Sequence, residues 1–394
     1  DVVLYVNGLP LAVIELKNAG TKHTTAEAAF HQLQTYVKEF PHAFQTVALV
    51  IASDGLTARY GTPFTPLNHY SPWNVDNDGT PVTIGVKHED SHYGTGLEFL
   101  IDGLFNVERF LQLMRDFTAF DSDPDIGLLK RIAKPHQYFA VSKAVANTVH
   151  AVESDGRIGV VWHTQGSGKS MEMELYAAKV MRHERLANPT VVVITDRTEL
   201  DTQLFDGFRD STLLPEDPVQ VKDRSHLRDL LTQSNSGGIY FTTLQKFGLT
   251  QAERDAGADH PVLSDRRNII VMADEAHRSH YDDLDGFARH IRDALPQAAF
   301  IACELPIAKK TTTMQVAMYP RVTHSSRMAR RRALPCSSGS RVRPKESAPG
   351  VLTAPSRGCR ATARARTARR SRRPGPPSRG RVVRPDQGPR RRAG

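Results

Sequence analysis

The residues that first suggest chemistry lie in a short glycine-bearing loop, Gly166-Ser167-Gly168-Lys169-Ser170. An apolar run, 158–162, precedes the loop, and a stretch with helical spacing, 171–182, follows it. Glycines let backbone N–H groups and a helix N-terminus surround a phosphate, because no side chain stands in the way. The Lys169 ammonium would then meet the β- and γ-phosphates, and the Ser170 hydroxyl would bind Mg²⁺. The loop predicts an ATP site, although His163 stands where the strict pattern has glycine.

Two carboxylates could complete this site. Asp274 and Glu275 follow a second apolar run, 269–273. We expect Asp274 to hold Mg²⁺ through water and Glu275 to polarise the water that attacks the γ-phosphate. Without the phosphate loop, the pair could equally be acidic residues that cap the N-terminus of a helix. The phosphate loop about 105 residues upstream favours the nucleotide site.

A second constellation lies near the start of the chain. Glu15 and Lys17 are two residues apart in an expected strand, so their side chains point to one face. A turn at Asn7-Gly8 would fold Asp1 back towards Glu15. Two carboxylates can hold Mg²⁺, which polarises a phosphodiester and activates water, while Lys17 steadies the developing charge. A surface strand with an ordinary ion pair would show the same short pattern.

Two kinds of element must position these groups. Residues 1–60 predict strands at 2–6, 11–16 and 47–52 and a helix at 24–40. Residues 62–96 are rich in Pro, Gly, Asn and His and predict a long surface excursion, and 97–120 predict helix. From residue 135, helical stretches alternate with short apolar runs, which predicts a doubly wound parallel α/β sheet. A domain boundary is expected near 120–134.

Charge divides the chain unevenly. It has 52 Lys plus Arg and 43 Asp plus Glu, a net of +9. Residues 321–394 hold 21 Arg and 1 Lys against 2 acidic residues and contain no aromatic residue. Such a segment cannot bury enough apolar surface to fold. We interpret it as the product of a shifted reading frame; the alternative is a genuine basic arm that binds phosphates.

Other features limit the class of protein. The first 302 residues contain no cysteine, which excludes a disulfide framework there and fits a reducing, cytoplasmic compartment. No stretch approaches the ~18 apolar residues of a membrane span. The chain starts inside an apolar run without Met or a signal peptide, so we expect it to be a fragment.

The wording of the motifs carries a resemblance to a known family. The loop followed by Asp274-Glu275-Ala276-His277 resembles superfamily 2 helicases and translocases, and in detail the R subunit of type I restriction endonucleases. Residues 162–170 resemble that family's motif I, and 195–204 and 242–247 resemble its DNA-contacting motifs Ia and Ib. Residues 134–141 resemble the upstream glutamine motif, in which Gln137 would read the adenine edge.

The N-terminal residues extend the resemblance. Residues 13–18 sit where the family carries its nuclease, and Gln32 and Tyr36 resemble its Gln-x-x-x-Tyr element. The resemblance implies a restriction-nuclease-like α/β domain at 1–100, a helical linker at 101–134 and a first RecA-like motor domain at 135–302. Residues 303–394 would be an aberrant, disordered basic tail.

The implied activity is ATP-dependent translocation of double-stranded DNA with Mg²⁺-dependent cutting, in complex with methylation and specificity subunits. The resemblance ends near residue 302, and motors of this kind need a second lobe. This chain is therefore expected to bind nucleotide weakly at most and not to translocate. Two alternatives stay open: a stand-alone superfamily 2 helicase with an accessory domain, or a non-catalytic remnant that binds nucleic acid through its tail.

Overall fold

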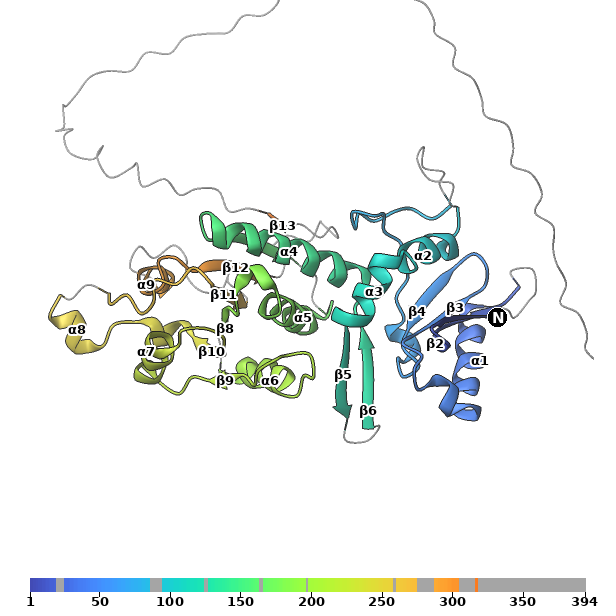
Figure 1. The fold of residues 1–394 in the computed structure, drawn as a ribbon, viewed down its shortest axis with the longest axis horizontal. Helices are drawn as coiled ribbons and strands as arrows, with labels where there is room; N and C mark the ends of the chain where they lie inside the picture. The colour runs from blue at the N-terminus through green and yellow to red at the C-terminus, as the bar shows by residue number, and fades with distance from the viewer. Residues whose placement is uncertain are drawn as a thin grey trace, which may run out of the picture. The chain divides into compact units, whose positions relative to one another are not determined.

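The computed structural model describes residues 1–18, 25–85, 94–123, 127–162, 166–195, 198–257, 260–274, 287–304 and 316–317. The chain divides into two compact units, Asp1–Thr323 and His324–Gly394, and every described residue lies in the first. Glu275, His163 and the basic segment 321–394 lie outside the described residues. Figure 1 labels the elements of the first unit.

The first sheet carries the N-terminal constellation and has the order β1-β2-β3-β4. Its strands are β1 (Val2–Val6), β2 (Leu9–Leu16), β3 (Leu49–Ser53) and β4 (Ala58–Gly61). Strands β1 and β2 are antiparallel, and Asn7 and Gly8 between them have φ values of 51° and 81°. Two such left-handed residues close a two-residue hairpin. The turn predicted at Asn7-Gly8 is confirmed.

Helix α1 (Ala26–Glu39) connects β2 to β3, which are parallel, and η1 (Pro41–Phe44) follows it. The Thr25 hydroxyl caps α1 by accepting a hydrogen bond from Ala28 N at 3.2 Å. Leu33, Val13 and Val50 pack together, so α1 covers the face of the sheet to which Val13 points. Glu15 is two residues beyond Val13 and lies on the same face.

Residues 62–85 are irregular and mostly exposed or half-buried, as expected, but a few of their side chains are anchored in the core. The segment contains a short η2 (Leu67–His69) and the indole of Trp73, which is fully buried. The indole centroid lies 5.9 Å from the ring of Tyr60 and 6.1 Å from that of Tyr138. A Cβ on Gly103 would lie 2.1 Å from the indole, so glycine is required there. Composition suggested a loop because this segment has no periodic pattern, but its aromatic residues belong to the core.

The segment 101–134 is helical only in its first part. Helices α2 (Gly96–Leu104) and α3 (Val107–Asp116) are followed by an antiparallel hairpin, β5 (Thr118–Asp123) and β6 (Gly127–Ile132). Tertiary contacts hold this hairpin: Lys130 Nζ donates to Val47 O at 2.8 Å, and Thr62 Oγ1 donates to Lys130 O at 2.6 Å. Partners 68 and 83 residues away cannot be found from local periodicity.

The second sheet carries the phosphate loop. Within the described residues its order is β13-β7-β12-β11-β8-β10-β9, with only β13 antiparallel to its neighbour. Its strands are β7 (Arg157–Trp162), β8 (Thr190–Thr195), β9 (Val219–Gln220), β10 (Ile239–Thr243), β11 (Ile269–Asp274), β12 (Ala299–Glu304) and β13 (Val316–Ala317). The predicted parallel sheet is confirmed. Strand β13 lies inside the segment expected to be disordered.

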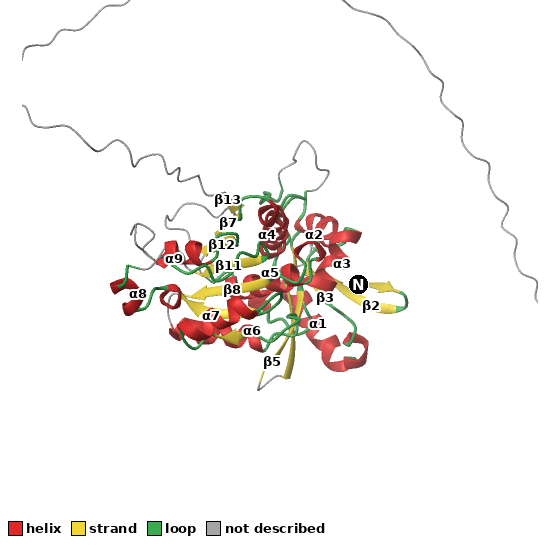
Figure 2. Cartoon of the chain, turned by 60° about the vertical axis from the view of Figure 1, so that its left-hand side comes forward, coloured by secondary structure: helices red, strands yellow, loops and turns green. Residues whose placement is uncertain are grey.

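Helices lie on both faces of this sheet (Figure 2). They are α4 (Pro135–Glu153), α5 (Lys169–Met181), α6 (Thr198–Arg209), α7 (Arg224–Gln233) and α9 (Phe287–Ala294). The short helix α8 (Gln251–Asp255) has no buried residue, and two short turns are η3 (Glu184–Leu186) and η4 (Leu244–Phe247). Val191 and Val193 pack in one core cluster with α4, α5 and α6. Val192 and Ile194 pack in another with α7 and α9. This two-sided burial is what a doubly wound sheet requires.

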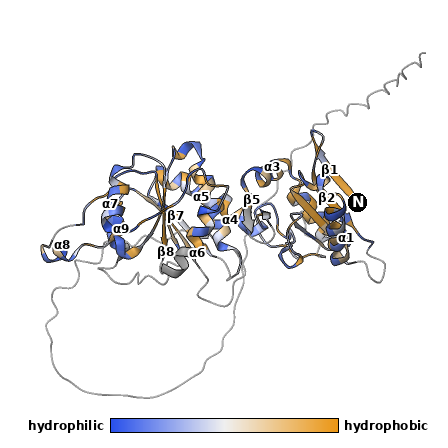
Figure 3. Cartoon of the chain, turned by 90° about the horizontal axis from the view of Figure 1, so that it is seen from below, coloured by the Kyte–Doolittle hydropathy of each residue, from blue (hydrophilic) through white to orange (hydrophobic). Residues whose placement is uncertain are grey.

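Hydrophobic residues gather on the strands, as Figure 3 shows for β1 and β2. Among the described residues, no helix combines the length and apolar character that crossing a bilayer requires.

Candidate nucleotide and metal sites

The phosphate loop adopts a backbone that only glycine tolerates easily. Gly168 has φ 89° and ψ 39° and caps the N-terminus of α5, and Gly166 has φ 79°. A Cβ added to Gly168 would lie 2.7 Å from Gln137 Nε2. Both the positive φ and the close approach therefore require glycine at 168.

Lys169 and Asp274 meet at the carboxyl ends of the parallel strands. Lys169 begins α5, just after β7, and Asp274 ends β11. The Lys169 ammonium forms an ion pair with Asp274 Oδ1, and the side chains keep 19% and 17% of their surface exposed. Ser170 is exposed beside Lys169. The two partners predicted from the sequence thus come together from a helix and a strand, while Glu275 lies outside the described residues.

Ser167 provides a test of whether a polar ligand fits this loop. Its Oγ is buried and has no hydrogen-bond partner among the residues that the structure describes. A buried hydroxyl without a partner is unfavourable unless a ligand or water restores the bond. Together with Lys169 and the helix N-terminus, this donor fits the phosphates of a nucleotide.

The Gln137 side chain contacts the phosphate loop. Its Oε1 accepts from Lys134 N at 2.8 Å, and its Nε2 donates to Gly168 O at 3.0 Å and Ser167 O at 3.4 Å. The side chain is 2% exposed. In this arrangement its amide is engaged with the protein backbone. No sequence pattern singles out His136, whose Nε2 lies 3.0 Å from Ser167 O; only the fold brings these residues together.

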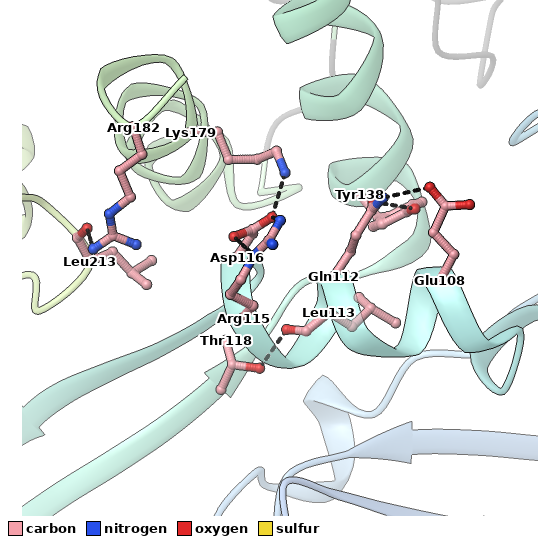
Figure 4. A network of polar contacts seen from close by, with 10 residues as sticks. All are labelled: Glu108, Gln112, Leu113, Arg115, Asp116, Thr118, Tyr138, Lys179, Arg182 and Leu213. Carbon is pink, nitrogen blue, oxygen red and sulfur yellow. Dashed lines mark hydrogen bonds and ion pairs between the residues drawn. The ribbon is translucent and has the colours of Figure 1, made fainter. Parts of the chain in front are cut away.

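Helix α3 supports the two helices that carry these groups, as Figure 4 shows. Tyr138 Oη of α4 donates to Gln112 Oε1 at 2.9 Å, and Lys179 Nζ of α5 donates to Asp116 Oδ2 at 2.7 Å. Burial tends to raise the pKa of Asp116, but hydrogen bonds from Arg115 and Lys179 outweigh it and hold this pKa below its usual value. The charged form of Asp116 thus anchors α5 at neutral pH.

The residues that resemble motifs Ia and Ib begin at strand ends. Thr195 ends β8 and is 2% exposed, while Asp196 and Arg197 lie outside the described residues. Residues 242–247 end β10 and form η4, where Lys246 Nζ donates to Val221 O. Thr195 is the first residue of the segment that resembles motif Ia, and the sequence pattern assigns no separate role to it.

The N-terminal constellation is partly assembled. Lys17 Nζ lies 2.7 Å from Glu15 Oε1, and the two side chains are 27% and 2% exposed. Val2 pairs with Ile14, so the same register extended by one residue sets Asp1 opposite Glu15. Tyr36 Oη of α1 donates to Asp1 Oδ2 at 3.4 Å. Gln32 is half-buried one helical turn before Tyr36.

Glu15 offers an oxygen that a cation could use. Its Oε2 is buried and has no hydrogen-bond partner within the described part of the chain. No group of three His, Cys, Asp or Glu residues that could hold a metal occurs among the described residues. Mg²⁺ commonly takes only one or two protein carboxylates and keeps several waters. Glu15 and Asp1 together fit that need.

The parallel sheet with its glycine loop, lysine and strand-end aspartate defines the class as a P-loop ATPase. The family described as "SWI2/SNF2 ATPase" matches residues 136–330, and "Type I restriction enzyme R protein N terminus (HSDR_N)" matches residues 1–69. The chain therefore belongs to the family of type I restriction enzyme R subunits, as its motifs predicted.

Curated relatives carry the same family name. The chain is 42% identical over 313 residues to "Type I restriction enzyme HindI endonuclease subunit" of Haemophilus influenzae, covering 76% of this chain and 29% of that protein. It is 36% identical over 316 residues to "Putative type I restriction enzyme MjaIXP endonuclease subunit" of Methanocaldococcus jannaschii, covering 77% and 28%. The chain thus spans less than a third of these relatives.

Among solved structures, the chain aligns with "ATP-dependent Type ISP restriction-modification enzyme LlaBIII bound to DNA" at TM-score 0.30 and 10% identity, over 45% of this chain and 14% of that one.

Proposed function

We propose that this chain supplies the nuclease and first motor domain of a type I restriction R subunit. The whole protein would use ATP to translocate double-stranded DNA and would cut it in a Mg²⁺-dependent reaction. The observation that carries the proposal is a lysine–carboxylate pair beside each of two separate sheets, Glu15–Lys17 and Lys169–Asp274. We propose domains at 1–100, 101–134 and 135–302, although the ATPase family match extends to residue 330.

At the nucleotide site, Ser170 and Asp274 would hold Mg²⁺, whose charge offsets that of the phosphates when it is bound. Without a ligand, the Lys169 ammonium neutralises the half-buried Asp274. With nucleotide bound, Lys169 would pair with the phosphates, and Asp274 would then hold the cation instead of the ammonium. Glu275 would polarise the attacking water. Gln137 would hold the loop in shape through its backbone carbonyls.

At the N-terminal site, Asp1 and Glu15 would hold Mg²⁺, which lowers the pKa of bound water and polarises a phosphodiester when present. Burial of a carboxylate is costly unless a positive charge is close, and Lys17 provides that charge in the ligand-free protein. With a cation on Glu15, the Lys17 ammonium would be available to the scissile phosphate. Tyr36 would orient Asp1 through its hydroxyl, and Gln32 would line the same face of α1.

The partners follow from the names of the relatives, which are endonuclease subunits. An endonuclease subunit that does not itself recognise a DNA sequence needs other subunits to recognise the target. We propose that these are a methylation and a specificity subunit, that the substrate is double-stranded DNA, and that the assembly works in the cytoplasm. The family relationship favours this function over a stand-alone helicase or a non-catalytic remnant.

The test uses the whole protein assembled with its partner subunits. Lys17→Ala is expected to reduce DNA cutting by about 10²–10⁴-fold and to leave ATP hydrolysis unchanged. Lys169→Ala is expected to abolish both hydrolysis and ATP-dependent cutting. Lys38→Ala, an exposed lysine on α1, is the matched control. Cutting at the wild-type rate by the Lys17→Ala protein would remove the nuclease assignment and leave a motor alone.

A further inference from the structure

A buried threonine lies one strand away from Asp274 at the carboxyl edge of the second sheet. Ala273 pairs with Ile194, so the parallel register extended by one residue sets Asp274 beside Thr195. Residues paired in this way point to the same face of the sheet. Val193 and Val191, two and four residues before Thr195, pack in the core cluster of α4 and α5. Thr195 and Asp274 therefore face the side on which Lys169 begins α5.

The Thr195 hydroxyl has an unusual environment. The side chain is 2% exposed, and Oγ1 has no hydrogen-bond partner within the described part of the chain. Thr190, at the other end of the same strand, is also fully buried, but its Oγ1 donates to Gly237 O at 2.6 Å and accepts from Arg266 at 2.6 Å. Buried hydroxyls in proteins normally have hydrogen-bond partners, as the Thr190 hydroxyl does. An unsatisfied one beside a ligand site suggests a partner that arrives with the ligand.

The spacing identifies what that partner would be. Neighbouring strands lie about 4.8 Å apart, so two short side chains on adjacent strands leave room for one bridging water. Asp274 is the proposed carboxylate for Mg²⁺, and Mg²⁺ keeps most of its waters when proteins bind it. We propose that Thr195 Oγ1 hydrogen-bonds to a water of the Mg²⁺ that accompanies the nucleotide. Thr195 is thus a positioning residue of the ATP site, and this role rests on the proposed function of that site.

The proposal predicts opposite effects on stability and on binding. Thr195→Val removes an unsatisfied buried hydroxyl and keeps the shape, so the ligand-free protein should unfold at a higher temperature. The same change should weaken binding of a non-hydrolysable fluorescent ATP analogue by about tenfold in Mg²⁺, and by less than about twofold in EDTA. Thr195→Ser keeps the hydroxyl and should bind like wild type in both buffers.

Thr190→Val is the matched control, because the same substitution removes a satisfied hydroxyl on the same strand. It should lower the unfolding temperature and leave the affinity for the analogue unchanged. All measurements use the full 394-residue chain. Equal loss for Thr195→Val in Mg²⁺ and in EDTA, no loss at all, or a lowered unfolding temperature would each overturn the proposal. Lys169→Ala distinguishes failure of the Thr195 role from failure of the ATP site: if the Lys169→Ala protein also binds the analogue like wild type, the assignment of the ATP site is wrong.

Discussion

Gln137 distinguishes two ways in which a glutamine can serve a nucleotide site. Its side chain is 2% exposed and makes three hydrogen bonds with backbone groups, two of them with the carbonyls of Ser167 and Gly168. We expect Gln137→Ala to lose about 1 kcal/mol for each of the two shorter bonds and about 1 kcal/mol for the void, roughly 3 kcal/mol of unfolding free energy in all. The change should also loosen the phosphate loop.

Because the loop is proposed to hold the phosphates and not the base, loosening it should weaken the binding of ATP and of GTP by the same factor. The sequence resemblance instead predicts that Gln137 reads the adenine edge, in which case ATP would weaken and GTP would not. Titration with fluorescent ATP and GTP analogues measures both affinities, and denaturant unfolding measures stability. Gln34→Ala is the matched control, since Gln34 lies on α1 beside the first sheet and its Nε2 donates to Pro63 O at 3.3 Å.

The control should affect stability slightly and nucleotide affinity not at all. Loss of ATP affinity alone in the Gln137→Ala protein would refute the assignment of this side chain to the loop.

Two further predictions concern ion pairs. Lys17→Met leaves the carboxylate of Glu15, which is 2% exposed, without its ammonium partner. Because Lys17 is itself 27% exposed, we expect denaturant unfolding to show a loss of about 2 kcal/mol of unfolding free energy, less than for a fully buried pair. Adding Glu15→Gln should restore most of this loss, and no loss at all would show that the pair is not desolvated. The hydrogen bonds from Arg228 lower the pKa of Glu253 to about 2 from 4.5, so their stabilisation is present above pH 4.5 and disappears as the pH falls towards 2. Urea unfolding should therefore show wild type more stable than Glu253→Gln at pH 6 and the two converging near pH 2; a constant difference would contradict this.

Local sequence patterns predicted the elements whose periodicity is strong. The strand expected at 2–6 became β1 with the same bounds, and the helix expected at 24–40 became α1, Ala26–Glu39. Both depend on local signals, a continuous apolar run and a 3.6-residue stripe. The phosphate loop and its acidic partner were recognisable because each directly follows such a run.

The remaining features depend on contacts between distant residues. The β5–β6 hairpin lies in a segment expected to be a helical linker, and hydrogen bonds to Val47 and Thr62, which flank strands of the first sheet, stabilise it. Trp73 lies in a segment with the composition of a loop, yet it is fully buried against Tyr60 and Tyr138. The contact between Gln137 and the loop spans 31 residues. No local pattern encodes any of these, because each partner is defined only after folding.

The proposed N-terminal roles of Asp1, Glu15 and Lys17 stay predictions. The register and the 2.7 Å pair bring Glu15 and Lys17 together and set Asp1 opposite Glu15.

The central claim is that this chain holds two independent cation sites, one of which needs a nucleotide. Calorimetric titration with Mn²⁺, in the presence and absence of a non-hydrolysable ATP analogue, tests it directly. We predict one site without the analogue and two with it; Glu15→Gln should remove the first and Asp274→Asn the nucleotide-dependent one, each leaving the other intact. Retention of both sites in the Glu15→Gln protein, or loss of both from either single change, would contradict the account.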